Sequence, residues 1–372
     1  MGESRHQISV RPNVEGFQPY SPGLSIAEIK ERYGLSYAIK LASNENPLGT
    51  SPAVVRTIER WAEAVFRYPQ AGSPELRRAL ADWHTCSADT IVAGNGSDEI
   101  IDLLLRVKPE PGRNNIVIFE PSFSIYRLQA SLCGLEIRTV PVNQDFSLPL
   151  RSLSDAADSR TSCVFVTNPD NPSGYAASAE AILELAGSLP PDCLLVVDEA
   201  YVDFAAEPSR HSLLPYVEPQ GNIVVLRTFS KIYGLAGLRV GYGVMPAGLA
   251  DMLLRVKLPF SLNLLAEKAA LSALEDQAFL EATRDAVLQG RSFLADELER
   301  LHCRPYPSQA NFICFAPPSA PRRVFEALLS QGIIIRPLDS YGLTDHLRVS
   351  VGRADENRAF ILALENILQN HE

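Results

Sequence analysis

The sequence predicts an α/β protein with two unequal domains: a large one built on a mostly parallel seven-stranded sheet between helices, and a smaller α+β one. Short apolar runs alternate with helical segments between residues 90 and 244, which is typical of a parallel sheet covered on both faces. The length of 372 residues exceeds the size at which one hydrophobic core usually stops growing. A long helical stretch then precedes a last set of apolar runs.

The chain begins with an arm, expected over residues 1–40, that is too short and too rich in proline to be a domain. It contains one modest helical stretch at 25–33. Residues 41–52 carry Asn, Gly and Pro at turn positions and predict a long, ordered loop. A helix is expected to follow over residues 52–64.

The large domain is expected over residues 41–260. Its apolar runs are rich in β-branched residues and lack polar alternation, so they predict strands buried on both faces. Sheets of this kind bind ligands beyond the carboxyl ends of their strands. The strands are expected at 90–93, 116–119, 136–140, 163–167, 194–198, 223–226 and 240–244.

The small domain is expected over residues 261–372. It begins with helical patterns, including a long one that would connect the two domains, and continues with three apolar runs and a closing helix. The helices are expected at 266–274, 279–301 and 355–369, and the apolar runs lie at 311–315, 333–336 and 346–351.

Composition excludes several classes of partner. A formal net charge of -10 argues against nucleic acid and anionic membranes. No apolar run approaches the length of a membrane span, and the first residues lack a signal-peptide pattern. The six cysteines are scattered without metal-type spacing, which is typical of reduced thiols. We therefore expect a cytoplasmic protein without a metal site.

The polar segment after residues 223–226 carries a candidate reactive amine. Thr228 and Ser230 flank Lys231, and Arg239 follows eight residues after the lysine. A desolvated lysine near other charges has a lowered pKa and can form a Schiff base with a carbonyl. A solvated lysine in a loop is the alternative, and the lysine alone would not decide between them.

A glycine-rich turn at residues 94–99 lies between a predicted strand and an apolar helix. Backbone N–H groups in such a turn can face an anion, and the helix N-terminus adds a favourable dipole. Phosphate is the expected ligand. An ordinary capping turn, with Asp98 in the first turn of the helix, is the alternative.

Two further motifs follow predicted strands. Residues 167–174 contain two Asn-Pro steps, which fix a side-chain amide in a rigid turn, although they are also compatible with an ordinary proline-rich loop. Asp198 ends a buried strand, where its charge needs a cation or a hydrogen-bond network. A protonated pyridine nitrogen would supply the cation. The alternatives are that Asp198 has a structural role or that it binds a metal, although no His cluster accompanies Asp198 in the sequence.

Together these segments supply the parts that a pyridoxal phosphate site needs: a Schiff-base lysine, a carboxylate for the pyridinium, an amide and a phenol near the ring, and a phosphate cradle. Further motifs extend over essentially the whole chain. They are L-A-S-N-E-N-P-L-G at 41–49, F-R-Y-P at 66–69, G-N-G-S-D-E at 94–99, P-S-F-S-I-Y at 121–126, T-N-P-D-N-P-S-G at 167–174, V-V-D-E-A-Y-V-D-F at 196–204, R-T-F-S-K-I-Y-G-L-A-G-L-R-V-G-Y at 227–242 and L-R-V-S-V-G at 347–352.

With these motifs the chain resembles the fold-type I, aspartate aminotransferase-like pyridoxal phosphate enzymes, and within them the histidinol-phosphate group. The resemblance implies that Lys231 forms the Schiff base with pyridoxal 5'-phosphate and then moves a proton between the substrate α-carbon and the cofactor. It implies that Asp198 pairs with the pyridinium. It also implies that the cofactor ring is contacted by Phe123, Asn171 and Tyr201. The implied phosphate-binding residues are Ser97, Asp98, Thr228, Ser230 and Arg239.

The resemblance also implies a homodimer, in which Tyr68 reaches the cofactor phosphate of the neighbouring subunit. It implies a pocket for a phosphorylated substrate, to which the arm contributes Tyr20. The other implied pocket residues are Asn44, Arg336 and Arg348. The segment between the two arginines varies in length among relatives, so the resemblance leaves the direction of Arg336 open.

The implied reaction is transamination of L-histidinol phosphate with 2-oxoglutarate, giving imidazole-acetol phosphate and L-glutamate, in histidine biosynthesis. Its substrates are small molecules. Two other enzymes share the scaffold and stay open, a threonine-phosphate decarboxylase and an aromatic amino-acid aminotransferase. A ligand-sensing regulator of the same fold ranks lower, because it carries a DNA-binding domain for which the arm is too short.

Overall fold

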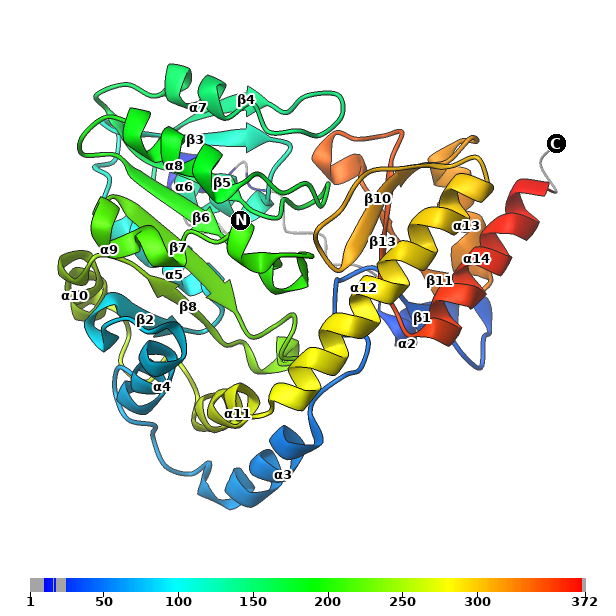
Figure 1. Ribbon diagram of the computed structural model, residues 1–372, viewed down its shortest axis with the longest axis horizontal. Helices are drawn as coiled ribbons and strands as arrows, with labels where there is room; N and C mark the ends of the chain where they lie inside the picture. The colour runs from blue at the N-terminus through cyan, green and yellow to red at the C-terminus, as the bar shows by residue number, and fades with distance from the viewer. Residues whose placement is uncertain (1–9, 16, 18–24, 370–372) are drawn as a thin grey trace, which may run out of the picture.

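A seven-stranded sheet forms the centre of the larger part of the molecule (Figure 1). The structure is a computed structural model and describes residues 10–15, 17 and 25–369. The strand order is β2-β8-β7-β6-β5-β3-β4, and β8 runs antiparallel to both of its neighbours while the other pairs are parallel. The seven predicted strands are confirmed. They are β2 (Ile91–Gly94), β3 (Asn115–Glu120), β4 (Glu136–Pro141), β5 (Thr161–Thr167), β6 (Leu194–Asp198), β7 (Ile223–Thr228) and β8 (Gly241–Val244).

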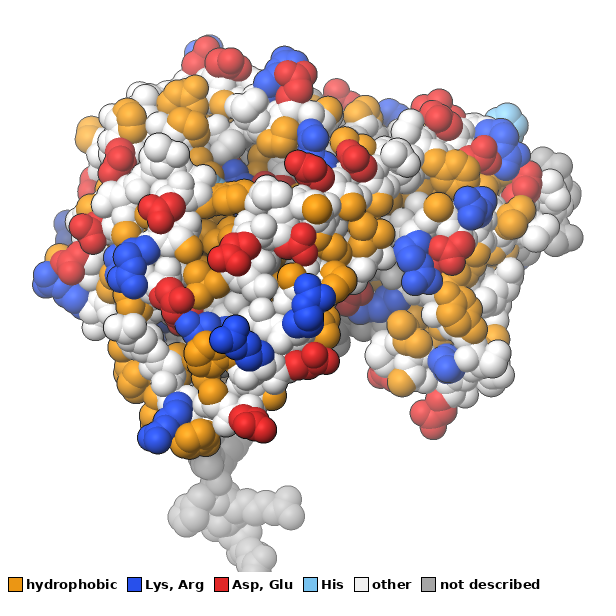
Figure 2. Space-filling model, turned by 60° about the horizontal axis from the view of Figure 1, so that its bottom comes forward, with side chains coloured by type: hydrophobic (Ala, Val, Ile, Leu, Met, Phe, Trp, Pro, Cys, Tyr) orange, Lys and Arg blue, Asp and Glu red, His pale blue; other side chains and the backbone are white. Residues whose placement is uncertain are grey.

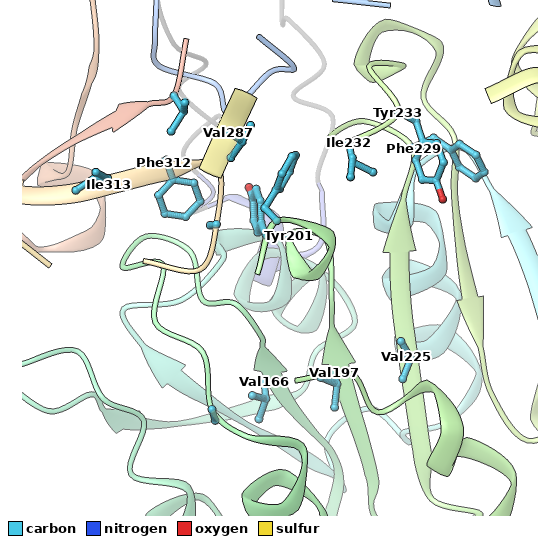
Figure 3. Packing of buried hydrophobic residues seen from close by; sticks show 14 of the residues in the cluster. Val166, Val197, Tyr201, Val225, Phe229, Ile232, Tyr233, Val287, Phe312 and Ile313 are labelled. Atoms are coloured by element: carbon cyan, nitrogen blue, oxygen red, sulfur yellow. The ribbon is translucent and has the colours of Figure 1, made fainter. Parts of the chain in front are cut away.

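Apolar side chains cover both faces of this sheet because successive strand residues point to opposite sides. In β6, Leu195 and Val197 belong to one hydrophobic cluster, whereas Leu194 and Val196 belong to another. Figure 3 shows how Val166, Val197 and Val225 of neighbouring strands point into the first cluster. The double burial explains why these strands read as continuous apolar runs.

Helices pack on both faces and around the edge of this sheet (Figure 1). The sequence did not predict α4, and the helix predicted over 52–64 ends earlier and continues as a 3-10 turn. These elements are α3 (Pro52–Trp61), η1 (Ala62–Ala64), α4 (Pro74–His84), η2 (Ala88–Thr90), α5 (Ser97–Val107), α6 (Ser124–Leu132), α7 (Leu150–Ala156), α8 (Ala179–Ser188), η3 (Val202–Phe204), η4 (Pro208–Arg210), η5 (Leu214–Tyr216), α9 (Val217–Gln220), η6 (Ala236–Leu238), α10 (Ala247–Val256) and α11 (Leu264–Glu275).

The long helix α12 (Gln277–Arg300) leads to the smaller part of the molecule (Figure 1). This part contains an antiparallel sheet of order β12-β13-β10-β9 with helices beside it. Its elements are β9 (Arg304–Pro305), β10 (Phe312–Ala316), α13 (Pro321–Ser330), β11 (Ile333–Ile334), β12 (Arg336–Pro337), η7 (Asp339–Tyr341), β13 (Leu347–Ser350) and α14 (Ala354–Gln369).

The N-terminal arm joins the smaller part through a pairing that the sequence did not predict. Strand β1 (Ile39–Lys40) lies parallel to β11, so that Ile39 is opposite Ile333. Helix α2 (Ile26–Tyr33) buries Ile29 in a cluster with Leu329 and Ile334, and the short helix α1 (Pro12–Glu15) packs near α6. The apolar run at 333–336 therefore supplies two strands in different sheets.

Helix α11, expected in the small domain, packs against α3 and α4 beside the seven-stranded sheet (Figure 1). The division into 1–40, 41–260 and 261–372 stays a prediction. Within the described ranges, no helix is both long and apolar enough to cross a membrane.

Candidate active site

Most of the predicted site residues gather in a cavity of about 250 Å³ beyond the carboxyl ends of β5, β6 and β7. Each of these strands contributes its last residue, Thr167, Asp198 and Thr228, which is where an open α/β sheet presents its ligand site. The complete lining is Ser43, Glu45, Ser97, Asp98, Phe123, Thr167, Asn171, Asp198, Ala200, Tyr201, Thr228, Ser230, Lys231, Ala236 and Arg239.

Lys231 lies in the turn after β7 and points its amine into this cavity. The Nζ atom donates a 3.3 Å hydrogen bond to the carbonyl of Ser43 and lies 5.4 Å from the centre of the Tyr201 ring. Burial, followed by the positive charge of Arg348, lowers the pKa of Lys231 to about 8. The amine is therefore neutral, and nucleophilic, at a lower pH than an ordinary lysine.

The loop at residues 41–52 holds the lysine turn in place. The side-chain amide of Asn46 donates to the carbonyl of Ile232 at 2.7 Å. Gly234 has a φ of +68°, and a Cβ there would lie 2.0 Å from the carbonyl oxygen of Gly49. A side chain at position 234 is thus excluded by both conformation and space.

Asp198 is a buried carboxylate, 3% exposed, at the bottom of the cavity. It accepts hydrogen bonds from the Tyr126 phenol at 3.0 Å and from the Ala200 N–H at 3.1 Å. Burial raises the pKa of Asp198 to about 6, and the hydrogen bonds partly oppose this rise. Among the described residues no Lys, Arg or His forms a salt bridge with it. A ligand with a buried cationic nitrogen would compensate the desolvation of this carboxylate.

Sequence reasoning assigned no role to Tyr126 or Thr167, although both belong to this polar group. The Tyr126 phenol contacts Asp198 and lies 2.8 Å from the Thr167 hydroxyl. Tyr126 follows Phe123 by three residues at the start of α6, and the two rings pack edge to face with centroids 5.6 Å apart. This i, i+3 spacing at a helix start is the signal that could have identified Tyr126.

The glycine-rich turn at 94–99 meets the segment after the lysine at close range. Helix α5 begins at Ser97, and its N-cap, Gly96, provides no side-chain hydrogen bond to the first turn. A Cβ on Gly241 would lie 2.2 Å from the backbone nitrogen of Ser97, and one on Gly96 would lie 2.6 Å from Arg239. Only glycine permits this approach, which brings backbone N–H groups and a guanidinium to one end of the cavity.

Arg239 faces the same turn with a left-handed backbone, φ +56°. Its guanidinium lies 3.1 Å from Oδ2 of Asp98 and 3.3 Å from Oγ of Ser230. Burial raises the pKa of Asp98, while Arg239 opposes the rise. The hydroxyl of Thr228 accepts the N–H of Ser230 at 3.1 Å. These donors and the helix N-terminus form a cradle whose hydrogen-bond donors and positive charge suit a phosphate monoester.

Arg348 approaches the cavity from β13 of the smaller sheet and is 5% exposed. Its guanidinium donates to the side-chain oxygen of Asn171 and, at 3.0 Å, to the carbonyl of Ala42. Its Nε atom is buried without a hydrogen-bond partner among the described residues. The side chain of Asn44 links the phenol of Tyr201, at 3.2 Å, to the Ser350 hydroxyl, at 2.8 Å.

Arg336 and Tyr68 lie away from the cavity. Arg336 is opposite Arg348 in the β12–β13 register, but it lines a separate cavity of about 700 Å³ beside α6. Tyr68 is 82% exposed and stacks on Phe260 with ring centroids 4.9 Å apart. Tyr20 lies outside the described residues.

Comparison with known proteins agrees with this geometry. Residues 37–364 match the family model "Aminotransferase class I and II". The histidinol-phosphate aminotransferase of Nitratidesulfovibrio vulgaris is 55% identical over 359 residues, covering 96% of each chain. The crystal structure of histidinol-phosphate aminotransferase from Sinorhizobium meliloti, in complex with pyridoxal-5'-phosphate, superposes with a TM-score of 0.88 at 26% identity, covering 100% of this chain and 99% of that one.

The L-threonine-O-3-phosphate decarboxylase of Porphyromonas gingivalis shares the fold, with a TM-score of 0.78 over 89% of this chain and 99% of its own, but only 23% of the sequence. That likeness extends to the fold alone, whereas the 55% identity extends over nearly the full length of both chains. The chain therefore belongs to the class I and II aminotransferases, and within them to the histidinol-phosphate aminotransferase group.

Proposed function

We propose that this protein catalyses the pyridoxal 5'-phosphate-dependent transamination of L-histidinol phosphate with 2-oxoglutarate, giving imidazole-acetol phosphate and L-glutamate. The observation that carries the proposal is the full-length identity of 55% with a histidinol-phosphate aminotransferase. The cavity supports it, because a low-pKa lysine, a buried carboxylate and an anion cradle line one small space. The decarboxylase alternative has only a likeness of fold.

The residues of the cavity fit the cofactor. Pyridoxal 5'-phosphate supplies an aldehyde for the lysine amine and a protonated ring that accepts the electron pair left at the substrate α-carbon. Asp198 is the group for the ring nitrogen, because its buried carboxylate otherwise lacks a cation among the described residues. Phe123, Asn171 and Tyr201 line the same space and would contact the ring.

The phosphate of the cofactor belongs in the cradle at the start of α5. The N–H groups of Ser97 and Asp98 lie at a helix N-terminus, and the guanidinium of Arg239 lies beside them. The hydroxyls of Thr228 and Ser230 line the same end of the cavity. With its phosphate held there, the cofactor keeps its position while the substrate exchanges.

Lys231 is the group that moves protons. Its amine, with a pKa of about 8, can take a proton from the substrate α-carbon and donate one to the cofactor. The carbonyl of Ser43 accepts a hydrogen bond from this amine at 3.3 Å and so restrains its direction. The two half-reactions then alternate, first with one amino substrate and then with the other.

Substrate recognition is assigned to Arg348, Arg336, Asn44 and Tyr20. The Nε atom of Arg348 has no hydrogen-bond partner among the described residues, so Arg348 retains donor capacity for an oxyanion beyond its bonds to Asn171 and Ala42. Arg336, at the edge of the larger cavity, would contact a more distant part of the substrate. Lys231, Arg348 and Arg239 bring positive charge to the site of a chain with net charge -10.

A homodimer is part of the proposal. Five hydrophobic side chains are strongly exposed on two neighbouring segments, Val65, Phe66, Tyr68, Leu258 and Phe260, and we call this set the aromatic surface. Figure 2, in which the bottom of the view in Figure 1 comes forward, shows hydrophobic side chains exposed among charged ones. A second copy seated on this surface would bury these rings, and Tyr68 would reach the phosphate cradle of that copy.

The six free cysteines favour a reducing compartment, and we propose the cytoplasm.

Single-turnover absorbance of the cofactor-loaded protein tests the function. Adding L-histidinol phosphate without a keto acid should convert the absorption band of the lysine-bound cofactor to that of the amine form. Adding 2-oxoglutarate afterwards should restore the first band. Conversion by phenylalanine but not by L-histidinol phosphate would instead support an aromatic aminotransferase. Release of carbon dioxide from added L-threonine O-3-phosphate would support a decarboxylase.

A further inference from the structure

Glu99 lies at the end of the glycine-rich turn but does not line the cradle itself. Its Oε2 atom accepts the N–H of Asn95 at 2.5 Å and the hydroxyl of Ser261 at 3.0 Å. A Cβ on Gly94 would lie 3.0 Å from this oxygen, so the carboxylate packs tightly against the turn. The position of Glu99 therefore helps to fix the path of residues 94–96, which lead into the first N–H groups of α5.

The charge of Glu99 is balanced by a buried amine. The side chain of Lys257 is only 6% exposed, and its Nζ lies 3.7 Å from Oε1 of Glu99 and donates to the hydroxyl of Ser261. Burial lowers the pKa of Lys257, and Glu99 opposes that effect. Within the described residues this is the only salt bridge of Lys257. An unpaired carboxylate at Glu99 would repel an anion in the neighbouring cradle.

Lys257 and Ser261 flank part of the aromatic surface in the sequence. Two residues of that surface lie between them: Leu258, which is 69% exposed, and Phe260, whose ring stacks on that of Tyr68. Phe260 has a φ of +65°, an uncommon conformation for an aromatic residue, which persists only where the surroundings fix the backbone. The side chains of Lys257 and Ser261 both contact Glu99, so they join this segment to the glycine-rich turn.

We propose that Glu99, together with Lys257 and Ser261, is a positioning residue that couples the phosphate cradle to the aromatic surface, so that phosphate binding and association of two copies strengthen each other. The inference rests on the proposed function for the cofactor and for the homodimer. The coupling is reciprocal by thermodynamic necessity: if association favours the phosphate-binding arrangement of the turn, phosphate favours association by the same factor.

The test compares pyridoxal phosphate with pyridoxal, which lacks the phosphate. Wild type, Glu99→Gln, Lys257→Met and the control Asp102→Asn are titrated with each compound, and circular dichroism verifies the fold. Asp102 lies one turn further along α5 in an exposed pair with Arg106, so its variant removes a carboxylate from the same helix without touching the turn. The ratio of the two dissociation constants isolates the phosphate contribution.

We expect the preference for pyridoxal phosphate over pyridoxal to fall about tenfold in Glu99→Gln and in Lys257→Met, and to stay unchanged in Asp102→Asn. Sedimentation should show tighter association of wild type with pyridoxal phosphate than with pyridoxal. In Glu99→Gln this difference should become smaller, leaving the part that the contact of Tyr68 with the phosphate of the other copy contributes. Should Glu99→Gln fail to fold, Lys257→Met provides the same comparison.

Equal weakening of both compounds in the two variants would overturn the inference, because a merely structural role predicts it. An association constant that is the same with both compounds in wild type would overturn it as well. If wild type shows the coupling but does not convert L-histidinol phosphate, the proposed substrate fails while the inference stands.

Discussion

The phenol of Tyr126, at the start of α6, donates a 3.0 Å hydrogen bond to Oδ2 of Asp198, at the end of β6. The contact joins a helix on one face of the sheet to a carboxylate that the cavity shares with Lys231. Because the bond is made to the charged form of Asp198, it opposes the rise in pKa that burial causes. Tyr126 therefore helps to keep Asp198 ionised.

Replacing Tyr126 with Phe tests this relationship. Loss of a hydrogen bond to a buried charged group costs about 1–3 kcal/mol, so cofactor affinity should fall about 5- to 150-fold. The pKa of Asp198 should rise further, and the pH at which affinity is lost on acidification should rise with it. Absorbance titration at several pH values measures both. Tyr216→Phe, a change at a partly exposed tyrosine outside the cavity, is the control. Equal affinity in the two variants would contradict the role.

Replacing Lys231 with Ala should abolish transamination while leaving part of the cofactor affinity, because the cradle and Asp198 stay intact. Loss of a positioned general acid–base group lowers rates by about 10²–10⁴-fold, and loss of the covalent link adds to this. Steady-state turnover and equilibrium dialysis of the cofactor measure the two effects. Lys108→Ala, at a lysine paired with Asp192 far from the cavity lining, should behave as wild type. Full activity in Lys231→Ala would falsify the assignment.

The pKa of Lys231 predicts a pH profile. Only the neutral amine attacks an aldehyde, so in cofactor-free protein the rate of covalent loading should rise with pH and level off above about 8. An ordinary lysine would give a rate that still rises towards about 10.4. Stopped-flow absorbance measures this rate. In Arg348→Met the plateau should move to higher pH, because the positive charge of Arg348 contributes to the lowered pKa. A plateau that stays in place would show that burial alone sets the pKa.

Gly241 and Gly237 offer a matched pair for the phosphate cradle. A Cβ at Gly241 would lie 2.2 Å from the nitrogen of Ser97, whereas at Gly237 no atom lies within 4 Å. We expect Gly241→Ala to destabilise the protein by about 1–3 kcal/mol through overpacking. It should also weaken binding of pyridoxal phosphate more than binding of pyridoxal. Denaturant unfolding and the two titrations measure these effects. A Gly237→Ala variant as impaired as Gly241→Ala would show that the close approach at Ser97 is not the cause.

The sequence predicted the sheet and the cavity well because both depend on local patterns. Strand β6 was predicted with its observed bounds, since an unbroken apolar run ends abruptly at Asp198. The polar residues that follow β5, β6 and β7 meet in space because parallel strands end at one edge of the sheet. A reader of the sequence can therefore place Asn171, Asp198 and Lys231 together without knowing how the helices pack.

Relationships between distant segments were harder to predict. The β1–β11 pairing joins two-residue strands that carry no periodic signal of their own. The pairing of Tyr126 with Asp198 depends on how α6 lies against the sheet. Arg336 and Arg348 are cross-strand neighbours, but Arg336 lines the cavity beside α6 whereas Arg348 bonds to Asn171 and Ala42, because side-chain direction depends on the local backbone and on what packs beside it. Spacing alone does not contain this information.

The parallel pair of β1 and β11 also bears on synthesis of the chain. Ile39 is opposite Ile333, and the two residues are 294 positions apart in the chain. At about 5–20 residues per second, a ribosome needs roughly 15 to 60 s to pass from one to the other. During that interval β1 is outside the ribosome, while its partner strand does not yet exist. The large sheet can assemble on the ribosome, but β1 can pair only after β11 has been synthesised.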